Sequence, residues 1–242
     1  MKTKLMIHKY YKVGMDYLYP RRCPICDGIV QANTMICTTC TEQVEIIEGK
    51  RCIKCSKAFA DYEYETCYDC RKQIQEYEYG IALFEYHSIV DSLFRFKYHG
   101  RCEYAMYYGA MIAHVLGTRI HRMNVDCLIP IPLHEKKLQL RGYNQAELIA
   151  KEVGTRLGIG VITDLVIRVR NTKPQKLLSG INRQNNLKKA FHIAQNDVKL
   201  DTVILVDDIY TTGNTINEVA RELKKANVKT IYFITVAIGN GF

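Results

Sequence analysis

The chain has 242 residues, 48% of them hydrophobic, which is enough apolar material for one large domain or two smaller ones. It contains no apolar run long enough to cross a membrane, and its basic first residues are not followed by an apolar core. We therefore expect a cytoplasmic protein rather than an integral membrane or secreted one. The formal net charge of +9 favours a polyanionic partner but does not distinguish DNA, RNA, a phosphorylated small molecule and an acidic protein.

Four Cys-x-x-Cys pairs follow a loosely helical segment at residues 1–22. One such turn places two thiolates on one side of a metal ion and a second turn completes a tetrahedron, so the pairs predict two structural zinc sites. Disulfides are the alternative, which the expected compartment disfavours. We expect pairing in sequence order, with an interleaved pairing as the other possibility. The predicted ligands are Cys23, Cys26, Cys37, Cys40, Cys52, Cys55, Cys67 and Cys70.

A charged stretch at residues 71–78 separates the last cysteine pair from an apolar run. We therefore expect an N-terminal helix and double zinc ribbon at residues 1–75 and a second domain at residues 76–242. Eight thiolates and two Zn²⁺ ions would lower the formal charge of the chain from +9 to about +5, which is still moderately basic.

Hydrophobic periodicity predicts the elements of the second domain. We expect a basic loop at residues 134–141, a helix that begins near Asn144 and ends at Gly158, and a basic, weakly periodic mobile loop at residues 170–186. The remaining predicted elements are strands at residues 79–86, 126–132, 161–169 and 230–238, a short helix at 89–96 and a helix through 105–115.

The most informative stretch is residues 203–215. Four apolar residues lead into adjacent carboxylates, then into a hydroxyl-rich turn with one glycine and a helical pattern, which predicts strand, loop and helix. Backbone N–H groups at a helix N-terminus suit a phosphate, and paired carboxylates can accept hydrogen bonds from vicinal hydroxyls, so a sugar phosphate fits. A capping box of Thr215 and Glu218 is the structural alternative. The predicted ligand residues are Asp207, Asp208, Thr211, Thr212, Gly213, Asn214 and Thr215.

This stretch resembles the phosphoribosyl pyrophosphate (PRPP) loop of type I phosphoribosyltransferases. Four further motifs accompany it: Phe-Lys-Tyr-His-Gly at 96–100, Pro-Ile-Pro-Leu-His at 130–134, Arg-Gly-Tyr-Asn-Gln at 141–145, and a basic run at 168–191. With the cysteine pairs, they make nearly the whole chain resemble the ComF family of competence proteins, most closely the ComFC type. Asn214 departs from the family pattern, in which a small residue is usual.

The resemblance implies an α/β fold: a type I phosphoribosyltransferase-like, mostly parallel sheet flanked by helices, with an N-terminal double zinc ribbon. Asp207 and Asp208 would hold the ribose hydroxyls of PRPP and residues 211–215 its 5′-phosphate. Ile131 and Pro132 would lie in the pyrophosphate loop, with Mg²⁺ bound by pyrophosphate and ribose oxygens. Candidate cations for the pyrophosphate are Lys97, Lys137, Arg141, Arg168, Arg170 and Arg183; among them Arg141 and Arg170 are the catalytic candidates.

The same resemblance implies a role in DNA uptake and in handling single-stranded DNA during natural transformation. A competence helicase of the ComFA type would be a partner, and any contact with the inner face of the membrane would be made through partners. The alternative is an active phosphoribosyltransferase, similar to an amidophosphoribosyltransferase, that acts on an unknown base or amine in nucleotide metabolism. No residue in the sequence identifies a general base, so both readings stay open.

Overall fold

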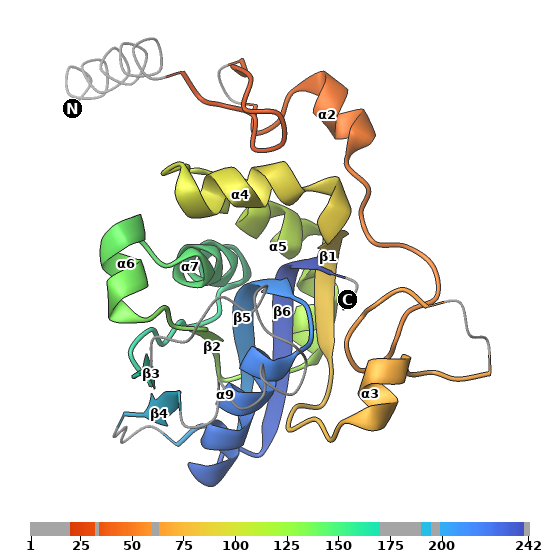
Figure 1. The fold of residues 1–242 in the computed structure, drawn as a ribbon, viewed down its shortest axis with the longest axis vertical. Helices are drawn as coiled ribbons and strands as arrows, with labels where there is room; N and C mark the ends of the chain where they lie inside the picture. The colour runs from red at the N-terminus through yellow and green to blue at the C-terminus, as the bar shows by residue number, and fades with distance from the viewer. Residues whose placement is uncertain (1–19, 32–33, 60–62, 170–189, 195–198, 240–242) are drawn as a thin grey trace.

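The computed structural model describes residues 20–31, 34–59, 63–169, 190–194 and 199–239. At its centre is a four-stranded parallel sheet in the order β1-β6-β5-β2 (Figure 1). Its strands are almost continuously apolar, as expected for a parallel sheet covered on both faces. They are β1 (Gly80–Glu85), β2 (Cys127–Pro130), β5 (Thr202–Tyr210) and β6 (Thr230–Ile238).

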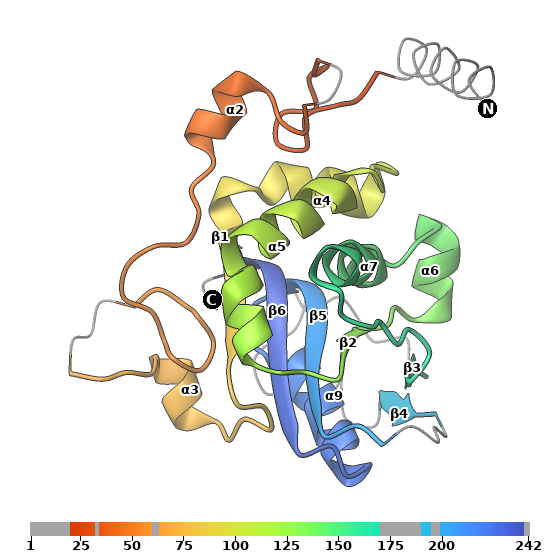
Figure 2. The same cartoon turned by 180° about the vertical axis from the view of Figure 1, so that it is seen from behind.

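Helices cover the two faces of this sheet (Figures 1 and 2). One face packs against α4 (Val90–Tyr98), α5 (Tyr104–Arg122) and α7 (Gln145–Leu157). The other face packs against α9 (Asn214–Lys225) and a small antiparallel pair, β3 (Val166–Arg168) and β4 (Phe191–Ile193). The 3₁₀ helix η1 (Tyr86–Ser88) links β1 to α4, and α6 (Glu135–Arg141) precedes α7. The fold class predicted from the sequence is confirmed.

The cysteine-rich part of the chain carries two short helices, α2 (Thr38–Gln43) and α3 (Tyr68–Lys72). Figure 1 shows α3 beside the β1 edge of the sheet and α2 near α4. Asp27 fixes the first cysteine group to α5, because its carboxylate accepts hydrogen bonds from Arg101 at 2.8 Å and from the hydroxyl of Tyr104 at 2.5 Å. No helix in the described ranges is both long enough and apolar enough to span a bilayer.

Three element predictions were wrong. The expected basic loop at 134–141 is the helix α6, which has no buried residue and therefore no hydrophobic periodicity to reveal it. The strand expected at 161–169 is reduced to β3, because the chain bends at 163–165 and Val161 makes only an isolated bridge with Leu128. Strand β5 continues through Asp207 and Asp208 to Tyr210, so the acid pair belongs to the strand and not to the loop.

The other predicted elements match the structure to within a few residues, except that α5 continues beyond the predicted residue 115 to Arg122. Helix α7 begins after Asn144 and ends at Gly158, as expected, and β6 has the predicted bounds. The N-cap of α9 is Gly213, so Thr215 lies inside the helix and does not cap it. The helix predicted within residues 1–22 and the mobile loop at 170–186 fall outside the described residues, apart from 20–22.

Candidate functional site

The eight predicted cysteines form two groups of four, and in each group the Sγ atoms lie within 4.8 Å of one another. The distance between Sγ atoms is 3.8 Å for Cys26 and Cys37 and 3.6 Å for Cys55 and Cys67. A tetrahedral zinc ion with Zn–S bonds of about 2.3 Å separates its sulfur ligands by about 3.8 Å. The thiols therefore fit two structural zinc ions, and the groups combine the pairs in sequence order.

The two zinc sites differ in burial. In the first site Cys26 is exposed and Cys37 half-buried. In the second site all four cysteines are buried in the same apolar cluster as the α9 face of the sheet. The second site is thus part of the core of the phosphoribosyltransferase-like fold, whereas the first lies at its periphery.

The acid pair lies at the carboxyl edge of the sheet. Strand β2 ends at Pro130, opposite Val206, and β5 runs beyond it, so Asp207 and Asp208 border the loop that leaves β2. The backbone N–H of Ile131, the first residue of that loop, donates to the carbonyl of Val206 at 2.9 Å. Ligands of parallel α/β sheets bind at this edge, and the predicted pyrophosphate loop lies next to the acid pair.

Adjacent residues of a strand point to opposite faces, so the two carboxylates differ in their surroundings, although the charge of Lys97 acts on both. The Nζ of Lys97, at the end of α4, lies 3.0 Å from the Oδ2 of Asp208. On the other face, Asp207 interacts electrostatically with Arg168 of β3. Burial, and then the charge of Asp208, raise the pKa of Asp207 to about 7, although Lys97 and Arg168 act in the opposite direction. Asp207 therefore titrates near neutral pH in the folded protein.

Two of the six predicted cations, Lys97 and Arg168, interact with the acid pair, and Lys137 and Arg141 lie near them. Burial lowers the pKa of Lys137, and the positive charges of Arg168, Arg141 and Lys97 lower it further, which places all four groups within electrostatic reach of one another. Such a cluster of cations suits a polyanion. Arg170 and Arg183, the other two candidates, lie outside the described residues.

The Arg-Gly-Tyr-Asn-Gln segment, residues 141–145, connects the loops around the site. Tyr143 donates its hydroxyl to the carbonyl of Phe96 at 2.5 Å, and the amide of Gln145 donates to the same carbonyl at 3.3 Å. The side-chain amide of Asn144 donates to the carbonyl of Ile131 at 3.0 Å, while its oxygen caps α7. This segment thus holds the end of α4 against the loop after β2, a role that spacing in the sequence could not reveal.

The predicted phosphate turn, residues 211–215, joins β5 to α9. Its Gly213 has a φ of +74°, a conformation that side-chain-bearing residues rarely adopt. A hollow of about 80 Å³ lies beside Asp207, Tyr210 and the turn. The Oγ1 of Thr212 is buried and has no hydrogen-bond partner in the described part of the chain, but Thr212 lines a separate, smaller pocket together with Cys70 and Tyr77. The groups suited to a phosphate in the hollow beside Asp207 are therefore the backbone N–H groups at the start of α9.

The histidines near these loops have structural contacts. The Nδ1 of His134 accepts from the backbone N–H of Lys136 at 3.2 Å and caps α6. His99 packs edge-on against Phe94 with ring centroids 5.2 Å apart. Both contacts are local ones, made within the segments that carry the two histidines.

Comparison with known proteins places two domain families on the chain. A double zinc ribbon domain matches residues 14–71, and a phosphoribosyl transferase domain matches residues 142–241. Competence protein F of Haemophilus influenzae is 39% identical over 116 residues, which cover 47% of this chain and 51% of the relative. DNA utilization protein YhgH of Escherichia coli K12 is 34% identical over 98 residues, covering 40% and 43%.

A longer match is to competence protein ComFC of Bacillus subtilis, which is 27% identical over 159 residues that cover 63% of this chain and 62% of the relative. The chain spans about half the length of the first two relatives.

Proposed function

Since the chain is a homologue of competence protein F and ComFC and combines a double zinc ribbon with a phosphoribosyltransferase domain, we propose that it binds Mg²⁺ and PRPP and acts in DNA uptake. In this proposal it handles single-stranded DNA during natural transformation, in the cytoplasm. A helicase of the ComFA type would be its partner and would connect it with the inner face of the membrane.

One observation carries the PRPP assignment: three features suited to the three parts of PRPP adjoin at one edge of the sheet. Asp207 and Asp208 can accept hydrogen bonds from the vicinal ribose hydroxyls. The turn at 211–215 offers the backbone N–H groups at the start of α9 to the 5′-phosphate, beside the hollow that Thr211, Asn214 and Thr215 line. The cations around Lys137 suit the pyrophosphate, next to Ile131 and Pro132.

The donor set also suits magnesium. Mg²⁺ prefers oxygen ligands and is usually held by substrate phosphates together with one or two carboxylates. The pyrophosphate and ribose oxygens of PRPP would supply most of its ligands, with Asp207 or Asp208 nearby. The bound ion would neutralise negative charge on the pyrophosphate, and the residues of the chain would orient the ribose.

The cation cluster also favours a second function, catalysis of phosphoribosyl transfer to an unknown base or amine, as in an amidophosphoribosyltransferase. Displacement of pyrophosphate from C1 builds positive charge on the ribose and negative charge on the leaving group. Lys137 and Arg141 would stabilise the leaving group, and the carboxylates would hold the sugar. Arg141 is itself oriented by a hydrogen bond to the Oε1 of Gln145 at 2.5 Å.

Calorimetric titration with Mg²⁺ and PRPP tests the site. Exchange of both carboxylates, Asp207→Asn with Asp208→Asn, should abolish binding while two zinc ions per chain are retained. Asp201→Asn is the matched control, because this half-buried carboxylate precedes the same strand at its opposite end and pairs with Lys229 at 3.1 Å, away from the site. Unchanged affinity in the double variant would refute the ribose assignment. Pyrophosphate release with a panel of bases and amines then decides whether the protein is an enzyme.

The DNA role needs a separate measurement. The relatives are named for competence and for DNA utilization, and the net charge of this chain is positive. Binding to single-stranded DNA should therefore weaken steeply between about 50 and 200 mM salt, because phosphate contacts release counterions. An absence of binding at the lower salt concentration would contradict this part of the proposal.

A further inference from the structure

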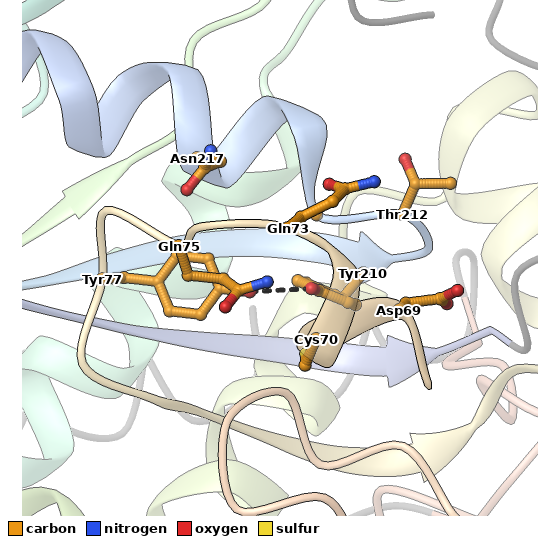
Figure 3. A pocket seen from close by; sticks show the side chains of 9 residues that line it. Asp69, Cys70, Gln73, Gln75, Tyr77, Tyr210, Thr212 and Asn217 are labelled. Carbon is orange, nitrogen blue, oxygen red and sulfur yellow. Dashed lines mark hydrogen bonds between the residues drawn. The ribbon is translucent and has the colours of Figure 1, made fainter. Parts of the chain in front are cut away.

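The second zinc site and the phosphate turn are separated by only one layer of side chains. Figure 3 shows this region, in which Cys70 of α3 and Tyr77 come from the cysteine-rich side, Tyr210 from the end of β5 and Thr212 from the turn after it. A pocket of about 10 Å³, room for roughly one water molecule, lies among them. A zinc ligand and the turn proposed to bind the 5′-phosphate therefore line the same pocket.

Two buried tyrosines bridge this layer. The hydroxyl oxygens of Tyr77 and Tyr210 lie 2.8 Å apart, and Figure 3 shows this hydrogen bond as a dashed line. Both rings pack on Phe233 of β6: Tyr210 stacks in parallel at 4.8 Å between centroids, and Tyr77 meets it edge-on at 5.0 Å. The hydrogen bond and the shared ring fix both tyrosines in position.

The hydroxyl of Tyr210 lies directly under the phosphate turn. A Cβ placed on Gly213 would come within 2.3 Å of that hydroxyl, so the turn rests on the tyrosine with no intervening atom. Gly213 is also the N-cap of α9, the end at which an anion would be held. A shift of the Tyr210 ring would therefore displace the backbone that is proposed to contact phosphate.

The segment between Cys70 and Tyr77 is attached to α9 as well. The Oδ1 of Asn217, in the first turn of α9, accepts from the backbone N–H of Glu76 at 2.7 Å. Farther along the helix, Arg221 forms an ion pair with Glu76 at 3.4 Å. The chain that leaves the second zinc site is thus connected to the phosphate-binding end of α9 both through the tyrosines and through Asn217.

We propose that Tyr77 and Tyr210 are positioning residues that couple the second zinc site to the phosphate turn, so that zinc and PRPP bind cooperatively. The proposal rests on the function proposed above, since PRPP is its probe. Such coupling is reciprocal. If zinc at this site raises the affinity for PRPP by some factor, then PRPP raises the affinity for zinc at this site by the same factor. The first zinc site lacks these contacts in the described part of the chain and should not respond.

The variants Tyr77→Phe and Tyr210→Phe remove one hydroxyl each and keep the ring on Phe233. We expect each to weaken PRPP binding about threefold to tenfold, the value of one buried hydrogen bond, while affinity for Mg·pyrophosphate stays unchanged. A general loss of stability would weaken both ligands alike. Tyr79→Phe is the matched control and should leave PRPP binding unchanged. The ring of Tyr79 packs on that of Tyr232, with centroids 4.8 Å apart, and Tyr79 does not line the pocket.

Zinc release to a chromogenic chelator tests the coupling from the other direction. Saturating Mg·PRPP should slow the release of one of the two zinc ions, and Tyr77→Phe should remove that protection. Equal release rates with and without PRPP in the unaltered protein would overturn the coupling without any variant. If PRPP does not bind the unaltered protein, the proposed function fails together with this inference; if it binds but the tyrosine variants behave like the unaltered protein, only the inference fails.

Discussion

The ammonium group of Lys97 lies 3.0 Å from the Oδ2 of Asp208, so the last turn of α4 reaches the carboxyl edge of the sheet. The next residue, Tyr98, is exposed, and the guanidinium carbon of Arg141 lies over its ring, 5.2 Å from the ring centroid. Residues 96–100 and 141–145 are therefore two parts of one wall beside the acid pair.

Lys97→Met should weaken PRPP binding by tenfold or more, because Asp208 would lose its partner in a mostly buried position. It should also raise the pKa of Asp207 beyond its value of about 7, since a nearby positive charge is removed. We expect the affinity for PRPP to rise as Asp207 loses its proton, because the carboxylate accepts the hydrogen bonds of the ribose hydroxyls. Calorimetry between pH 6 and 9 should then show this rise at a higher pH in the variant than in the unaltered protein. Lys151→Met, which breaks the exposed pair with Glu147, is the control and should change stability by less than about 0.5 kcal/mol.

Asp207→Asn should stabilise the fold at alkaline pH while it abolishes PRPP binding. The pKa of Asp207 is raised from its ordinary 3.8 to about 7, so between these values the folded protein holds a proton that the unfolded chain has released. The carboxylate therefore makes the fold progressively less stable as pH rises through this window. In thermal unfolding, the melting temperature of the variant should clearly exceed that of the unaltered protein at pH 8 and differ little from it at pH 4. An equal increase in melting temperature at both pH values would contradict the raised pKa.

Gly213→Ala should damage the phosphate turn. The added methyl group would strain a backbone with a φ of +74° and also clash with the Tyr210 hydroxyl. Gly158→Ala is the matched control: its φ is +69°, but no atom lies within 4 Å of the added methyl, so only the conformational cost of about 1 kcal/mol applies. Gly213→Ala should therefore lose more stability in urea unfolding and more PRPP affinity in titration than Gly158→Ala. Equal losses would mean that the Tyr210 hydroxyl does not limit the space at Gly213.

Loss of a zinc ligand should affect the fold at the second site but not at the first. Cys40→Ser should release one zinc ion and leave PRPP binding largely intact, because the first site is peripheral. Cys55→Ser should prevent folding of the sheet as well, since Cys55 is fully buried in its core. Zinc content and circular dichroism measure both effects. A folded Cys55→Ser variant with one zinc ion would show that the second site is dispensable for the fold.

The sequence revealed those features that a local pattern encodes. Cysteine spacing predicted the two metal groups, and the apolar run of β5 with the following polar turn predicted the strand, turn and helix. Helix α6 was missed because all of its residues are at least partly exposed, and the extent of β5 was missed because carboxylates rarely continue a strand.

Long-range contacts could not be predicted from spacing. Lys97 and Lys137 were only two of six possible cations, and it was the fold that placed Lys97 against Asp208 and Lys137 near Lys97. The pairing of Tyr77 with Tyr210 spans 133 residues and follows no periodicity. The boundary between residues 75 and 76 stays a prediction, although the cysteines before it and the strands after it share one core.

The strand order has a consequence for synthesis of the chain. Within the described sheet β1 pairs only with β6, with Gly80 opposite Phe233, although about 150 residues separate the two along the chain. The ribosome synthesises the chain from its N-terminus, so both cysteine groups can bind zinc long before β6, the partner strand of β1, has been made. The aromatic ring that holds Tyr77 and Tyr210 also belongs to β6. Metal loading should therefore be the early event of biogenesis, and completion of the sheet the late one.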